Sequence, residues 1–140
     1  MLRNLARVAA AFVLSVETGM RGGEICQLNA SCPVCTSIRL PKTKNGTARD
    51  VPLSPIARQV LDDVGGKFGL NQSQKDALFR KMKERAAING LNFHDARHTA
   101  ITRLAQKLNP LELARMVGHR DLKMLMRYYN ESADEIAKKL

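Results

Sequence analysis

The chain has 140 residues, the length of a single domain, and a chain of this size can bury a sizeable hydrophobic core. Its 23 Lys and Arg residues outnumber its 13 Asp and Glu residues, and the formal net charge of +10 indicates an anionic partner. Nucleic acid is the first candidate and an acidic membrane surface the second. The sequence has no apolar run long enough to cross a bilayer, and Arg7 interrupts the apolar stretch 5–14, which argues against a signal peptide.

The cysteines give no clear metal or disulfide pattern. There are three, an odd number, which excludes a full disulfide framework and favours a reducing cytoplasm. Cys32 and Cys35 have the spacing of half a zinc site, but the other half would need Cys26 and a distant histidine. We therefore expect ordinary thiols in a loop, and no metal.

Helices are expected over most of the chain. Residues 2–17 are rich in Ala, Val and Leu, which predicts a helix buried on more than one side. Ser54-Pro55 and Asn109-Pro110 each place a capping side chain before a proline at the first helical position. The expected helices are 2–17, 21–28, 56–64, 73–88, 95–107, 110–117, 122–129 and 133–140.

A β-hairpin is expected between the second and third helices. Ile38 and Leu40 alternate with polar residues, and Val51 and Leu53 do so on the return. Asn45-Gly46 between them suits a tight turn, whose central positions need positive φ. The predicted fold class is therefore mostly α with a small antiparallel β-hairpin or sheet, in a single domain spanning residues 1–140.

Two cationic side chains stand at positions where an anion could bind. Arg21 follows a glycine turn at the start of a helix, where free backbone N–H groups attract anions. Lys44 lies near the predicted hairpin tip and could act as a mobile charge or a proton donor. Taken singly, each is more simply explained as a solvated surface charge.

The second half of the chain holds histidines and a tyrosine pair. His94 and Arg97 are three residues apart, so they share a helix face, and together they suit a phosphate. His98 is expected on the other side, as a structural or solvated residue. Gly118 ends a helix and presents His119, and Tyr128 follows nine residues after that histidine.

Taken together and in this order, these motifs resemble the tyrosine recombinases, the phage-integrase family. The matching residues are Thr18-Gly19-Met20-Arg21-Gly22-Gly23-Glu24, Lys44, His94-Asp95-Ala96-Arg97-His98-Thr99, Gly118-His119 and Tyr128. The resemblance implies a tyrosine-recombinase catalytic domain that cuts and rejoins DNA through a 3′-phosphotyrosyl intermediate, without metal, ATP or another cofactor. It also implies duplex DNA as partner and self-association on DNA, as a synaptic tetramer in the family, with no membrane.

The resemblance assigns a role to each matching side chain. Arg21 and Arg97 look like the phosphate-binding arginines, and Lys44 like the lysine that protonates the leaving 5′ oxygen. His94 looks like the first histidine, which assists proton transfer, and His119 like the second, which donates to a non-bridging oxygen. Tyr128 looks like the nucleophile because its interval from His119 is the family's usual one, and Tyr129 is the competing candidate.

Further expectations concern the surroundings of this site. The candidates for contacts to the DNA backbone are Arg39, Lys42, Arg49, Arg103 and Arg120. Family members usually carry an N-terminal DNA-clamping domain, which is absent from this chain. We expect a cytoplasmic protein, bacterial or phage-encoded and nucleoid-associated. Two alternatives remain: a truncated, catalytically impaired DNA-binding remnant, or DNA relaxation like that of a type IB topoisomerase.

Overall fold

The computed structural model of the chain describes residues 2–29, 35–42 and 48–140. Its elements are α1 (Leu2–Thr18), α2 (Gly22–Cys26), β1 (Ser37–Leu40), β2 (Arg49–Pro52), α3 (Pro55–Asp63), α4 (Gln72–Arg85), α5 (Asp95–Leu104), α6 (Pro110–Val117), the 3-10 helix η1 (Leu122–Tyr128) and α7 (Ala133–Ala137). This confirms the predicted fold class, mostly helical with a small antiparallel sheet. None of the helices described is long and apolar enough to span a membrane.

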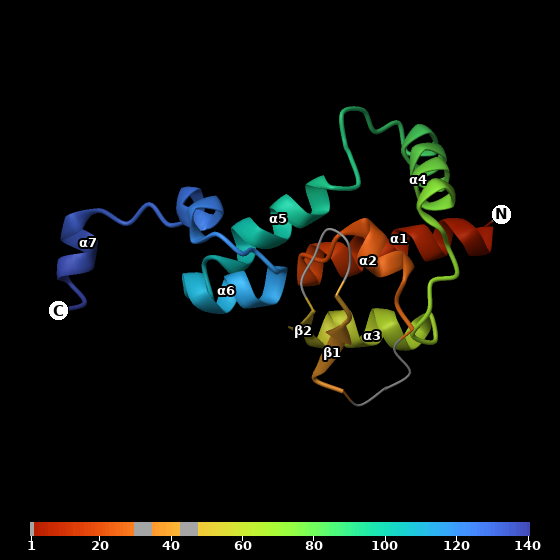
Figure 1. The fold of residues 1–140 in the computed structure, drawn as a ribbon. Helices are drawn as coiled ribbons and strands as arrows, with labels where there is room; N and C mark the ends of the chain where they lie inside the picture. The colour runs from red at the N-terminus through yellow and green to blue at the C-terminus, as the bar shows by residue number, and fades with distance from the viewer. Residues whose placement is uncertain (1, 30–34, 43–47) are drawn as a thin grey trace.

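Helix α1 lies at the centre of the fold and packs against α2, α3, α4 and α5 (Figure 1). It is buried on more than one side, as predicted, with Val8, Ala11 and Leu14 in the core. Its C-terminus turns sharply at Gly19, whose φ is 71°. There the Ser15 hydroxyl donates to the Met20 carbonyl at 2.8 Å, which fixes the turn leading to Arg21.

The two strands pair antiparallel, with Ile38 opposite Val51 and Leu40 opposite Arg49. One face of this hairpin is buried and the other is exposed, in the alternation expected for a strand pair with one side on the core. Arg49 lies on the buried face. The predicted Asn45-Gly46 turn lies outside the described residues.

Several helix boundaries confirm the capping signals, and others differ. Ser54 accepts a hydrogen bond from the backbone N–H of Ala57, and Asn109 accepts one from Glu112, so α3 and α6 begin where predicted. Leu122–Tyr128 forms a 3-10 helix, tighter than the α-helix expected over 122–129. The last helix ends at Ala137, and none of its residues is buried.

The C-terminal segment lies apart from the rest of the fold. Figure 1 shows α7 at the end of an extended stretch that leaves η1, on the side opposite the N-terminus.

Three aromatic rings pack together at the start of α5. The centroids of Phe12, Phe79 and Phe93 lie between 5.3 and 5.6 Å apart. Because Phe93 is buried just before His94, this cluster anchors the entry into α5.

Candidate active site

Four of the predicted catalytic residues line one cavity of about 400 Å³: Arg21, His94, Arg97 and His119. They come from the N-terminal end of α2, the start of α5 and the turn after α6. The other side chains lining it are His98, Ile101, Lys123, Met124 and Arg127. Lys44 lies outside the described residues.

Arg97 is held inside the protein by two backbone carbonyls. Its side chain donates to Gly19 O at 2.6 Å and to Val117 O at 3.0 Å, and the residue is only 3% exposed. Burial, followed by the charge of Arg21, lowers the pKa of Arg97 to about 10, so the group stays cationic at neutral pH. A guanidinium has five N–H donors, so it can bind both carbonyls and still face an anion in the cavity.

Arg21 lies half-buried at the N-cap of α2 and is oriented by Glu24. The backbone N–H of Arg21 donates to Glu24 Oε2 at 2.9 Å, and its guanidinium lies 3.4 Å from Glu24 Oε1. Burial by itself raises the pKa of Glu24, but hydrogen bonds from Arg49 and Arg21 outweigh it and leave that pKa below its ordinary value. Glu24 is therefore an anion between two arginines.

The expectation that Arg49 contacts the DNA backbone is wrong. Its side chain is 6% exposed and forms a forked ion pair with Glu24, at 2.7 and 2.9 Å. Arg103 also forms an ion pair, with Glu17 at 3.2 Å, although the Arg103 side chain is partly exposed. Arg39 pairs with Asp50 on the open face of the hairpin. Lys42 and Arg120 are exposed, as a contact to DNA would require.

The first histidine motif places both of its imidazoles in the cavity. His94 and Arg97 share a helix face, as predicted, but His98 also lines the cavity, so the expectation that it lies on the other side is wrong. Four residues make about one helical turn, which returns His98 to the face of His94. The two rings meet edge to face, 5.0 Å apart. Partial burial and the charges of His98 and Arg97 lower the pKa of His94.

His119 follows Gly118, which ends α6 in the left-handed conformation at φ 75°. Burial, then the charges of Arg97, Arg21 and Arg127, lower the pKa of His119 to about 4. The imidazole is therefore neutral at pH 7 and can donate one hydrogen bond without carrying charge. Among the described residues, its Nδ1 is buried and has no hydrogen-bond partner.

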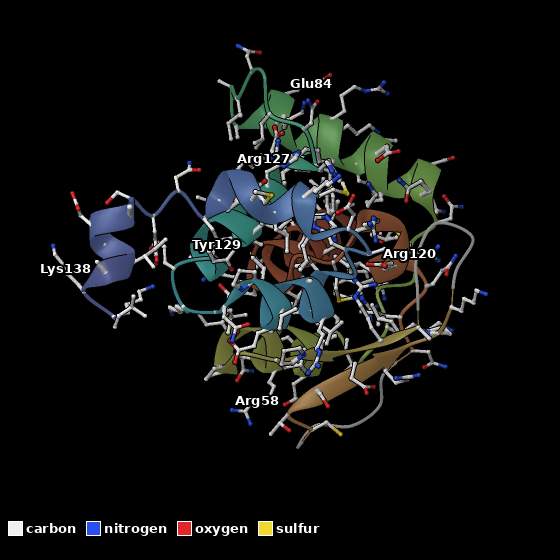
Figure 2. All side chains as sticks on the ribbon, turned by 60° about the vertical axis from the view of Figure 1, so that its left-hand side comes forward. Arg58, Glu84, Arg120, Arg127, Tyr129 and Lys138 are labelled. Atoms are coloured by element: carbon white, nitrogen blue, oxygen red, sulfur yellow. The ribbon has the colours of Figure 1, made fainter. Side chains whose placement is uncertain are left out.

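The two tyrosines have different surroundings. Arg127 donates a 2.7 Å hydrogen bond to the Tyr128 hydroxyl and lies 3.5 Å from His98 Nδ1, so it connects this phenol with the cavity. Tyr129 donates to the carbonyl of Leu108 at 2.8 Å, and burial raises its pKa. In Figure 2, Arg127 on η1 lies well away from Lys138 on α7.

Three polar residues that line the cavity were given no catalytic role from the sequence: His98, Lys123 and Arg127. The spacing could have predicted two of them, because His98 lies one helical turn after His94 and Arg127 directly precedes Tyr128. For Lys123 the sequence offers no such indication beyond its charge. With Arg21 and Arg97, the side chains of Lys123 and Arg127 make a site suited to a phosphate, since guanidinium and ammonium groups bind its oxygens strongly.

Cys26 and Cys35, the two cysteines among the described residues, do not line this cavity. Cys26 has a free thiol, and partial burial raises its pKa. Cys35 is disulfide-bonded, so the expectation of an ordinary thiol is wrong there. Among the described residues no group of His, Cys, Asp and Glu side chains has the arrangement of a metal site.

Solved structures with a similar fold include two integrases bound to DNA. The Tn1549 transposon integrase in complex with circular intermediate DNA has a TM-score of 0.74 at 19% identity, over 93% of this chain and 56% of that one. For the lambda integrase dimer bound to a core site the TM-score is 0.70 at 18% identity, over 94% of this chain and 47% of that one. The fold is thus that of the catalytic domain of tyrosine recombinases.

Sequence comparison identifies the family. The model of the phage integrase family matches residues 3–135, and the chain belongs to that family. A putative integrase/recombinase of Haemophilus influenzae is 42% identical over 146 residues, which cover 96% of this chain and 48% of that protein. The shufflon-specific DNA recombinase of Escherichia coli is 39% identical, over 92% of this chain and 36% of that protein. The chain thus spans half or less of the length of these relatives.

Proposed function

We propose that this chain is the catalytic domain of a site-specific DNA recombinase that cuts and rejoins duplex DNA through a 3′-phosphotyrosyl intermediate. The observation that supports this most is the convergence of Arg21, His94, Arg97 and His119 on one cavity. Arg127, which lines the same cavity, donates a hydrogen bond to the hydroxyl of Tyr128. A scissile phosphate in the cavity would therefore lie among cations, with a phenol nearby.

Catalysis follows from the charge that develops on the phosphate. Attack on a phosphodiester increases negative charge on the non-bridging oxygens, and groups placed there stabilise the transition state more than the ground state. Arg21 and Arg97 supply fixed positive charge, because guanidinium groups stay protonated at neutral pH. His119, neutral at pH 7, donates a hydrogen bond to a non-bridging oxygen.

The covalent step exchanges one phosphate ester for another. The Tyr128 oxygen forms a bond to phosphorus, and the bond from phosphorus to the 5′ oxygen breaks. His94 assists removal of the phenolic proton, and Lys44 protonates the leaving 5′ oxygen. Because the phosphotyrosyl ester keeps the energy of the original bond, the reverse attack by a 5′ hydroxyl rejoins DNA without ATP. The arginines stabilise the charge on the phosphate, which is the role of metal ions in other phosphoryl transfers.

Duplex DNA is the partner that the charge distribution favours. The net charge of +10 predicts attraction to the phosphate backbone and binding that weakens steeply with salt. Lys42 and Arg120 are exposed and can contact that backbone. Strand exchange requires more than one active site, so we expect the protein to self-associate on DNA. We also expect it in the bacterial or phage-infected cytoplasm, associated with the nucleoid.

The test is trapping of the covalent adduct. The full chain is incubated with a pool of nicked suicide duplexes of randomised sequence, in which the cleaved fragment diffuses away, and adducts are resolved on a denaturing gel. We expect an adduct with wild type and with Tyr129→Phe, and none with Tyr128→Phe, which should still bind DNA. Peptide mapping should place the nucleotide on Tyr128, and a chelator should leave the yield unchanged.

Each other outcome supports another function or another nucleophile. An adduct that survives Tyr128→Phe and vanishes with Tyr129→Phe would assign the nucleophile to Tyr129. Retarded DNA with no adduct from wild type on any substrate identifies a DNA-binding remnant. Relaxation of supercoiled plasmid without sequence preference indicates activity like that of a type IB topoisomerase.

A further inference from the structure

The buried pair Arg49–Glu24 connects strand β2 with helices α2 and α6, next to the candidate active site. Arg49 extends from β2 and donates through Nη1 and Nη2 to the two carboxylate oxygens of Glu24, at 2.7 and 2.9 Å. Its Nε donates to the Met116 carbonyl at the end of α6, at 3.0 Å. All three nitrogens of the guanidinium therefore have partners inside the protein, and each partner belongs to a different element.

The partners of Arg49 lie directly beside the residues that line the cavity. Glu24 accepts the backbone N–H of Arg21, so its carboxylate sets the start of α2. Met116 precedes Val117, whose carbonyl binds Arg97, and His119 follows two residues later. A movement of the Arg49 guanidinium would thus be transmitted to Arg21 on one side and to Arg97 and His119 on the other.

The Arg49 side chain packs closely against the backbone of Gly118. A Cβ added to Gly118 would lie 3.0 Å from Arg49 Nη1 and 3.1 Å from its Cζ. The left-handed φ of Gly118 strains any other L residue there, and the guanidinium leaves little room for a side chain. The turn that presents His119 is therefore shaped around the Arg49 side chain.

We propose that Arg49 is a positioning residue of the active site, which holds Arg21 through Glu24 and His119 through the Met116 carbonyl in the geometry needed for cleavage. The inference rests on the proposed function and extends it to a residue that does not touch the phosphate. A forked guanidinium is needed because one lysine ammonium cannot reach both carboxylate oxygens and the carbonyl with the same fixed geometry. Small displacements of positioned groups are costly in rate.

A purely structural ion pair is the competing explanation, and Glu17 provides the matched control. Glu17 is a buried glutamate that pairs with Arg103 at 3.2 Å and accepts from Ser54 Oγ at 2.7 Å. It does not line the cavity. Glu17→Gln therefore removes a buried carboxylate charge from an arginine pair in the same way as Glu24→Gln, but away from the cavity.

The experiment separates rate from binding and from folding. Arg49→Lys, Glu24→Gln and Glu17→Gln are compared with wild type in the full chain, at a temperature where circular dichroism shows each to be folded. DNA affinity is measured by retardation, and the rate of adduct formation is measured at saturating DNA. We expect Arg49→Lys and Glu24→Gln to cleave bound DNA about tenfold to a hundredfold more slowly with little change in affinity. Glu17→Gln should lower the melting temperature and leave that rate unchanged.

Two results would overturn the proposal. One is cleavage of bound DNA at the wild-type rate by folded Arg49→Lys and Glu24→Gln. The other is an equal slowing by Glu17→Gln, which would show a general effect of lost stability. If wild type itself forms no adduct, the proposed function fails first, so the two failures are distinguishable.

Discussion

The guanidinium of Arg97 donates a 2.6 Å hydrogen bond to the backbone carbonyl of Gly19, although the two residues are 78 positions apart in the sequence. This contact joins α5 to the turn between α1 and α2. The same turn carries Arg21, so one hydrogen bond sets the relative position of two cationic side chains of the cavity.

The Gly19 turn is expected to be intolerant of any side chain. Gly19 has φ 71°, and an added Cβ would lie 2.9 Å from Val117 Cγ1. We predict that Gly19→Ala costs about 1–2 kcal/mol from the left-handed backbone, with about 1–3 kcal/mol more from overpacking. Urea denaturation measures the loss.

Gly90 provides the control for this substitution. It has φ 75°, but among the described residues no heavy atom lies within 4 Å of an added Cβ. Gly90→Ala should therefore show the backbone cost alone, and Gly19→Ala should exceed it. Equal losses for the two variants would contradict the steric part of the explanation.

Tyr129 is expected to contribute stability and not chemistry. Its hydroxyl donates to the Leu108 carbonyl at 2.8 Å, between α5 and α6. Tyr129→Phe should lower the free energy of unfolding by about 0.5–1.5 kcal/mol, the usual net value of such a hydrogen bond. The adduct yield on a suicide substrate should be unchanged. Loss of the adduct in a folded Tyr129→Phe protein would contradict this assignment.

His119 should make the folded protein sensitive to acid. Burial and the charges of Arg97, Arg21, Arg127 and Arg49 lower its pKa from the ordinary 6.5 to about 4. Between these two pH values the unfolded chain binds more protons at this residue than the folded chain, so its contribution to stability falls as the pH falls.

The comparison of wild type with His119→Gln isolates that contribution. Between pH 7 and pH 5, we expect wild type to lose more free energy of unfolding in urea than the variant, which has no imidazole at this position. Parallel pH profiles for the two proteins would show that the imidazole is not held neutral by its surroundings.

Arg127 is expected to assist the Tyr128 nucleophile. Its guanidinium donates to the phenol oxygen at 2.7 Å, and its Cζ lies 4.8 Å from the ring centroid. A cation at this position stabilises negative charge that develops on the oxygen as the proton leaves. Arg127→Gln should slow adduct formation at saturating DNA by about tenfold, less than for a fully buried oxyanion donor, because the side chain is exposed.

Lys139→Gln controls for the loss of one positive charge. Lys139 is exposed and pairs with Glu131 in the C-terminal segment, apart from the cavity. Its loss should weaken DNA binding at most slightly and leave the rate of the bound complex unchanged. The same slowing in both variants would mean that net charge, and not the contact to Tyr128, determines the rate.

Local signals in the sequence predicted most of the secondary structure correctly. Helices α3 and α6 begin at Ser54-Pro55 and Asn109-Pro110 because a capping side chain and a proline act within one turn. The alternation that predicted the hairpin also acts over neighbouring residues. Segment 122–129 was less well predicted, since apolar spacing does not distinguish a 3-10 helix from an α-helix in so short a stretch.

The sequence by itself determined the helices, the hairpin and, through the order of its motifs, the family to which the chain belongs. Only the tertiary structure decided that Arg49 is buried and His98 faces the cavity. Arg49 shares the inner strand face with Val51, but a charge is buried only if a partner compensates it, and its partner Glu24 is 25 positions away. That pairing depends on how α2, β2 and α6 pack, which no local pattern records.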